Sequence, residues 1–127
     1  MKRIIVTEKA PAPVGPYSQA VQLGDTLYIS GQIAIDPATG ALVKGTIEEE
    51  THRVMQNIHA VLLEAGSGFQ HVLKCTVFVK DMNLYSRINE IYGQYFDHAT
   101  APARELVEVT NLPKFVNIEI STIAFVP

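Results

Sequence analysis

The order in which strand-like and helix-like periodicity follow one another is the feature that most constrains what this chain can fold into. Residues 17–23 and 27–35 are β-prone runs on either side of a Gly-Asp-Thr turn. Residues 72–80 form a further run rich in β-branched side chains, and 104–109 and 116–126 alternate near the C-terminus. These runs predict a β-sheet whose strands come from distant parts of the sequence.

Segments with helical spacing lie between these runs. Thr46 and Glu49 form a capping-box pair, after which apolar residues recur at intervals of three and four. Asp81 or Asn83 caps a second such segment, which extends through Phe96. The order β-β-α-β-α-β-β predicts an α+β domain in which both helices pack on one face of the sheet.

The composition of residues 1–127 is that of a single domain with a sparsely charged surface. The chain has 47% hydrophobic and 18% charged residues, against about 25% charged residues in an average soluble protein. Because a small domain has a high ratio of surface to volume, these charges are too few to cover it. We therefore expect copies of the chain to cover part of its apolar surface.

Charge, cysteine and histidine content argue against several classes of function. The formal net charge is −3 and Lys and Arg do not cluster, so the chain lacks the electrostatic footprint of a nucleic-acid-binding protein. Cys75 lies in an apolar run, which indicates a buried structural thiol rather than a nucleophile. His52 and His59 have no metal-ligand spacing. With no predicted disulfide, signal peptide or membrane span, we expect a cytoplasmic protein without a metal.

Alternation along the C-terminal runs separates polar and apolar faces. Arg104 and Leu106 share one face of their run, and in the last run Glu119 lies opposite the apolar residues. We expect Arg104, Leu106, Glu119, Ser30 and Phe125 to lie together on the sheet face that the helices leave uncovered. Other copies of the chain are the natural cover for this face.

A guanidinium, a carboxylate and a glycine within predicted strands are the candidates for chemistry. The planar fork of Arg104 is suited to bidentate binding of a carboxylate, and its alternative is a surface ion pair with Glu105 or Glu108. Glu119 is either a half-buried carboxylate with a perturbed pKa or a residue of a solvated face. Gly31 indicates either a close approach to the backbone or a bulge.

A set of motifs also spans nearly the whole chain: APAPVGPYSQAV, YISGQIAIDPATG, CTVFVKDM, INEIYGQYF, TAPARELVEV, LPK and VNIEISTIA. In order and spacing, the set resembles the RidA (YjgF-type) reactive intermediate deaminase family. The resemblance implies a chorismate-mutase-like α+β fold assembled as a homotrimeric barrel with clefts between subunits. It also implies cofactor-independent hydrolysis of enamines and imines, such as 2-aminoacrylate, to 2-oxo acids and ammonia (2-iminobutanoate/2-iminopropanoate deaminase).

The same resemblance implies roles for individual residues. Arg104 matches the family arginine that binds the substrate carboxylate, and Glu119 matches the acid that positions the attacking water. Positions near the bound substrate are matched by Tyr17, Ser30, Gly31, Asn89 and Leu106. Glu105 and Leu106 depart from the small residues that commonly follow the arginine, which leaves the substrate range open. By alternation Glu105 faces away from Arg104.

Two other functions stay open at this point. Members of the family have been described as endoribonucleases or translation inhibitors, although a chain of net charge −3 has no basic surface for phosphates. A non-catalytic regulator that binds small carboxylates would keep the same Arg104 and Glu119. The sequence does not separate an enzyme from such a sensor.

Overall fold

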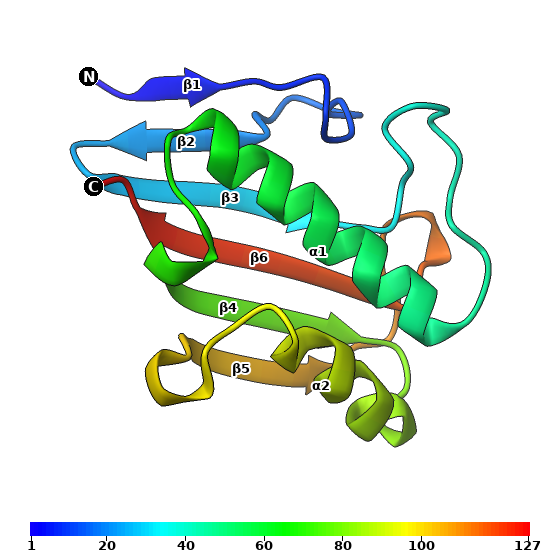
Figure 1. Cartoon of the computed structure of the whole chain (residues 1–127). Helices are drawn as coiled ribbons and strands as arrows, with labels where there is room; N and C mark the ends of the chain where they lie inside the picture. The colour runs from blue at the N-terminus through cyan, green and yellow to red at the C-terminus, as the bar shows by residue number, and fades with distance from the viewer.

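The computed structural model describes residues 1–127 as a six-stranded mixed sheet with both helices on one face (Figure 1). The strands and helices are β1 (Arg3–Ile5), β2 (Ala20–Leu23), β3 (Thr26–Gln32), α1 (Ile47–Glu64), β4 (Val72–Val79), α2 (Tyr85–Gly93), β5 (Ala103–Glu108) and β6 (Ile118–Phe125). The spatial order is β1-β2-β3-β6-β4-β5. β4 and β5 pair in parallel, and all other neighbours are antiparallel. The predicted fold class is confirmed.

Helix α1 shows how directly the local sequence specifies its element. The Thr46 hydroxyl accepts a hydrogen bond from the Glu49 backbone N–H at 3.2 Å, which satisfies a free donor of the first turn. Val54, Ile58 and Leu62 are fully buried against the sheet. This apolar stripe and the inner faces of the strands form the hydrophobic core.

Helix α2 is shorter than the sequence pattern predicts. Asp81 caps a short 3₁₀ turn, Met82–Leu84, by accepting from the Asn83 N–H at 2.9 Å, and α2 itself begins at Tyr85. It ends at Gly93 rather than at Phe96.

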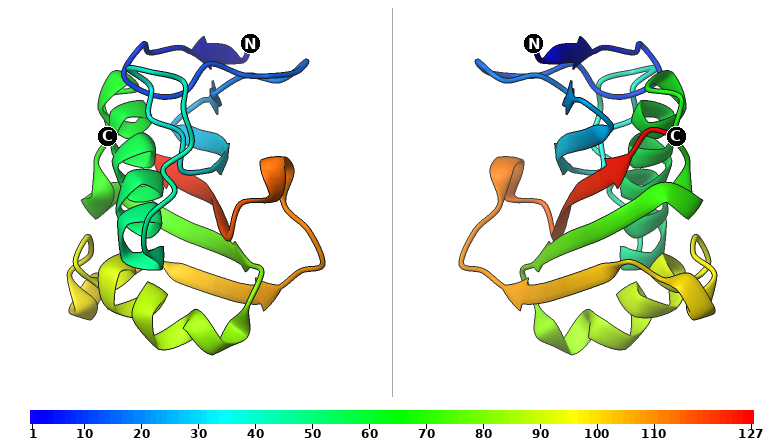
Figure 2. Two further views of the ribbon diagram at one scale, coloured as in Figure 1. Left: turned by 90° about the vertical axis from the view of Figure 1, so that its right-hand side faces the viewer. Right: turned by 90° about the vertical axis from the view of Figure 1, so that its left-hand side faces the viewer.

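The opposite face of the sheet carries neither α1 nor α2, and only the short 3₁₀ turn Pro113–Phe115 lies on that side (Figure 2). Tyr28 on β3 is 50% exposed there and Val107 on β5 is 42% exposed. The expectation of a mixed face without an intramolecular cover is therefore confirmed. Neither helix is long and apolar enough to cross a membrane.

Candidate functional site

Glu119 lies on the uncovered face of β6 with an unsatisfied carboxylate. The side chain is half-buried, and burial raises its pKa above the ordinary glutamate value. It makes no hydrogen bond or ion pair within the chain, so no partner in the chain offsets the cost of burying the charge. Glu119 is therefore an accessible carboxylate that is more readily protonated than an ordinary surface glutamate.

Gly31 on β3 makes room for this carboxylate. A Cβ at Gly31 would lie 2.7 Å from Glu119 Oε2 and 2.8 Å from its Cδ, closer than van der Waals contact allows. The β3–β6 register also shifts between Ile29 and Gln32. Both alternatives for Gly31 are therefore correct: it lies in an irregular stretch of strand, and a side chain approaches its backbone closely.

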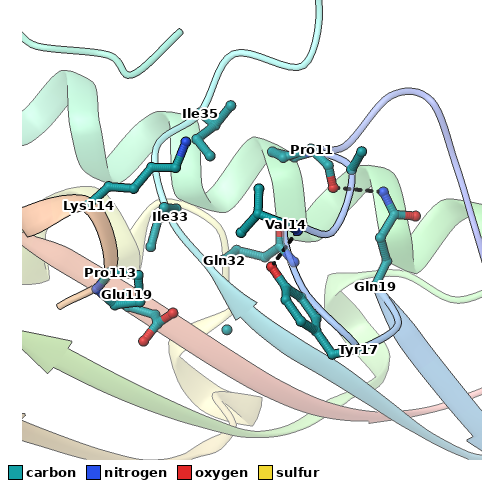
Figure 3. Close-up of a pocket in the computed structure, with 12 residues that line it drawn as sticks. Pro11, Val14, Tyr17, Gln19, Gln32, Ile33, Ile35, Pro113, Lys114 and Glu119 are labelled. Carbon is teal, nitrogen blue, oxygen red and sulfur yellow. Dashed lines mark hydrogen bonds between the residues drawn. The ribbon is translucent and has the colours of Figure 1, made fainter. Parts of the chain in front are cut away.

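A small cavity of about 60 Å³ opens beside Glu119 and Gly31. Tyr17, Pro113 and Lys114 are among its other lining residues (Figure 3). The Tyr17 hydroxyl accepts from the Val14 N–H at 3.3 Å, which folds the proline-rich loop back over the cavity. The lining of this cavity combines the Glu119 carboxylate and the Lys114 side chain with proline and isoleucine side chains.

The loop above this cavity is held by residues behind it. Ser30 Oγ donates to the Ser18 carbonyl at 2.6 Å, so its hydroxyl anchors the loop and does not line the cavity. The buried Gln19 side chain donates to the Pro11 carbonyl at 2.9 Å and accepts from the Thr7 N–H at 2.7 Å. Gln19 was not predicted, because the run at residues 17–23 contains other polar residues and the pattern does not single it out.

Arg104 lies on the other side of the sheet, against α2. Its Nη1 donates to Asn89 Oδ1 at 2.7 Å and its Nη2 donates to the Tyr85 hydroxyl at 3.0 Å. The guanidinium carbon also lies 5.0 Å from the centre of the Tyr92 ring, within cation–π range. A cavity of about 570 Å³ borders Arg104 and Asn89, with His98 and Pro102 among its lining residues.

The prediction that Arg104 and Glu119 share one face is wrong. Arg104 pairs with Cys75, whose side chain is buried in the core beneath the helices, whereas Glu119 pairs with Phe78. Since positions 75 and 78 are three residues apart in one strand, their side chains point to opposite faces. Leu106 shares the helix-side face with Arg104, and Ser30 does not. One chain therefore does not bring the guanidinium and the carboxylate together.

The nearby charged residues do not neutralise Arg104. Glu105 lies on the uncovered face and forms an ion pair with Lys74 at 3.0 Å, as its predicted orientation requires. Glu108 accepts from the Met82 N–H at 2.8 Å. The alternative in which Arg104 forms a surface ion pair with either glutamate is thus wrong.

Cys75 lies behind the Arg104 region as a buried thiol. Its Sγ is 3.8 Å from the Thr122 hydroxyl, and burial raises its pKa, which disfavours the thiolate needed for nucleophilic attack. The interpretation of a structural thiol is confirmed. No group of three or more His, Cys, Asp and Glu side chains is placed to hold a metal ion.

Comparison with known proteins places this geometry in a family. The family model described as Endoribonuclease L-PSP matches residues 7–126. The chain belongs to this RidA/L-PSP family. A RutC family protein of Pyrococcus abyssi is 52% identical over 124 residues, covering 98% of this chain and 97% of that protein.

Other RidA/L-PSP relatives have more specific names. A 2-iminobutanoate/2-iminopropanoate deaminase of the goat, Capra hircus, is 48% identical over 124 residues, covering 98% of this chain and 90% of that protein. The crystal structure of E. coli TdcF with bound serine has a TM-score of 0.91 at 39% identity, covering 97% of this chain and 98% of that chain. The fold of this RidA/L-PSP chain is thus one on which a relative binds a small amino acid.

Tyr85 and Tyr92 are contacts of Arg104 that sequence reasoning missed. The helical pattern treats Tyr92 as an apolar core position, and it places Tyr85 inside a helix rather than at its start. The available signal is the spacing of Tyr85, Asn89 and Tyr92, which puts three side chains on one face of a helix.

Proposed function

We propose that this RidA/L-PSP family member is a cofactor-independent deaminase that hydrolyses small 2-imino and 2-enamino acids to 2-oxo acids and ammonia. One observation carries the proposal. Arg104, a fixed guanidinium, and Glu119, an unsatisfied carboxylate, are exposed to separate cavities on opposite faces of the same sheet. These are the two groups that binding and hydrating an imino acid require.

The active site in this proposal lies between subunits of a homotrimer. Arg104 on the edge strand β5 of one copy approaches Glu119 on the uncovered face of another. The uncovered face, with its exposed Tyr28 and Val107, supplies apolar surface for such an assembly. Burial of this apolar face between copies would explain why the chain has too few charged residues to cover the surface of a monomer.

The proposed reaction needs binding, a positioned water and proton transfer. Arg104 binds the substrate carboxylate, which places the imine carbon beside Glu119. Glu119 accepts a proton as the water oxygen bonds to that carbon and the C=N electron pair moves to nitrogen, and it passes this proton to the nitrogen to give a carbinolamine. Glu119 then accepts the hydroxyl proton as the carbonyl forms and passes it to the same nitrogen, so that the C–N bond breaks and ammonia leaves. A positioned acid–base group of this kind contributes about 10²- to 10⁴-fold in rate.

The goat deaminase and the bound serine of TdcF support different readings of the same site. The deaminase name supports catalysis. The serine supports a non-catalytic regulator that senses small carboxylates. The family description as an endoribonuclease has less physical support, because a net charge of −3 does not favour binding to phosphates.

The proposal is tested by adding the purified protein to a serine or threonine dehydratase reaction and measuring formation of pyruvate or 2-oxobutanoate. We expect faster formation with the wild type and none of this acceleration with Arg104→Ala. Circular dichroism is the control, and it should show the wild-type fold in this variant. No acceleration by the wild type would favour the sensor. Full activity in Arg104→Ala would refute the site. RNA cleavage that depends on Arg104 would favour the nuclease alternative.

A further inference from the structure

One face of helix α2 is built around the Arg104 guanidinium. Tyr85, Asn89 and Tyr92 follow one another at spacings of four and three residues, which aligns them along a single helix face. All three contact the guanidinium, through the Tyr85 hydroxyl at 3.0 Å, the Asn89 oxygen at 2.7 Å and the Tyr92 ring at 5.0 Å. We refer to these three side chains as the α2 cradle.

We infer that Tyr85 and Tyr92 are positioning residues that fix the Arg104 guanidinium for carboxylate binding, an inference that rests on the proposed function. A guanidinium has five N–H donors. The α2 cradle engages the two Nη groups with one bond each, so three N–H donors stay free. Those donors suffice for a bidentate contact with a substrate carboxylate.

The α2 cradle restricts the motion that would otherwise weaken this contact. A free arginine side chain samples many rotamers and loses that freedom on binding. Here the Tyr92 ring, which is buried, lies against the guanidinium and limits its swing, while the Tyr85 hydroxyl limits its rotation. The binding group is thus ordered before the substrate arrives, which favours affinity.

The α2 cradle is itself tied to the core helix. Arg87, two residues beyond Tyr85, donates from Nε and Nη2 to the two carboxylate oxygens of Glu48 on α1, each at 2.7 Å. This contact lowers the pKa of Glu48 to about 2, because the carboxylate accepts both bonds from a cation. The start of α2, and with it Tyr85, is therefore held in place from outside the site.

The test compares two tyrosines that each donate or accept one side-chain hydrogen bond. Tyr85→Phe removes the hydroxyl that binds Arg104. Tyr95→Phe is the matched control, because the Tyr95 hydroxyl lies 2.7 Å from His52 Nδ1 and does not contact Arg104. KM and kcat are measured for both variants in the coupled dehydratase reaction, over a range of imine supply.

We expect Tyr85→Phe to raise KM by about ten- to a hundredfold, the effect of one hydrogen bond to a charged group, with kcat within about twofold of the wild type. Tyr95→Phe should leave both constants unchanged. A loss of stability alone would not raise KM in this selective way. Equal KM values for the two variants, or a fall in kcat with KM unchanged, would overturn the inference.

A readout that needs no turnover separates this inference from the proposed function. In ¹⁵N spectra the Arg104 Nη signals should be separate in the wild type and in Tyr95→Phe, because the α2 cradle slows guanidinium rotation. They should merge in Tyr85→Phe. If the wild type lacks deaminase activity, this spectral difference still supports the α2 cradle, and identical spectra in all three proteins would overturn it.

Discussion

Arg104 and Glu119 differ in how far their own chain fixes them. Arg104 makes two side-chain hydrogen bonds to α2 and lies against the Tyr92 ring. Glu119 makes none, and its carboxylate has its place because Gly31 lacks a Cβ. Direct contacts within the chain hold the Arg104 guanidinium in place. The Glu119 carboxylate has room beside Gly31 but no partner in the chain that fixes it.

This contrast matches what each group has to do. A group that binds a carboxylate of constant charge gains from being held rigidly. A group that exchanges protons with water gains from a pKa that lies closer to neutrality and from the absence of competing partners. We therefore expect changes at Arg104 to act on binding and changes at Glu119 to act on the rate and its pH dependence.

The largest expected effect is that of Glu119→Gln. Removing the proton acceptor should lower kcat by about 10²- to 10⁴-fold, with a smaller change in KM. In the wild type kcat should fall as the pH is lowered through the pKa of Glu119, since protonation removes the base. Because burial raises that pKa, the fall should begin above the ordinary glutamate range. A pH profile measured on a preformed imine checks this, and an unchanged rate in Glu119→Gln would contradict it.

Gly31→Ala should have the next largest effect. The added methyl would lie within 3.0 Å of three Glu119 side-chain atoms, so the carboxylate has to move. A displacement of about 1 Å at a catalytic group costs up to about 10²-fold in rate. The reduction in kcat should be accompanied by an unchanged KM. Gly24→Ala, at a turn with φ +59° where nothing surrounds a Cβ, is the control for a general cost to folding. Equal kcat values for Gly31→Ala and the wild type would show that Glu119 tolerates displacement.

Glu105→Gln should have the smallest effect. Glu105 is next to Arg104 in sequence, yet it pairs with Lys74 on the other face of β5. We expect KM to change by less than about twofold, as for a partly exposed ion pair. A large decrease in KM would mean that the Glu105 charge reaches the substrate, and it would weaken the distinction between the two faces.

The sequence predicts those parts of the fold that depend on local rules. The capping pair Thr46 and Glu49 locates α1, and alternation identifies Glu119 and Gly31 as unusual residues within strands. Alternation within one strand does not show on which face of the sheet its side chains lie relative to those of another strand. The face of Arg104 depends on its parallel pairing with Cys75, which no periodicity within β5 specifies.

The sequence does not predict the α2 cradle either, for a related reason. A 3₁₀ turn between Asp81 and Tyr85 determines where α2 begins, and hydrophobic periodicity does not distinguish such a turn from the first turn of an α-helix. Hydrophobic periodicity also counts Tyr92 as a core residue, which it is, and gives no sign that its ring faces a guanidinium. Contacts between a helix and an edge strand are therefore visible in the structure alone.

The central claim is that Arg104 of one copy and Glu119 of another form one active site. It is tested by mixing two inactive variants, Arg104→Ala and Glu119→Gln, under conditions that allow subunits to exchange. In a ring where each site takes one group from each of two neighbours, a quarter of the sites in an equal mixture carry both intact groups. We predict recovery of about one quarter of the wild-type activity, against about one hundredth of it or less in either variant alone. No recovery after verified subunit exchange would contradict a shared site.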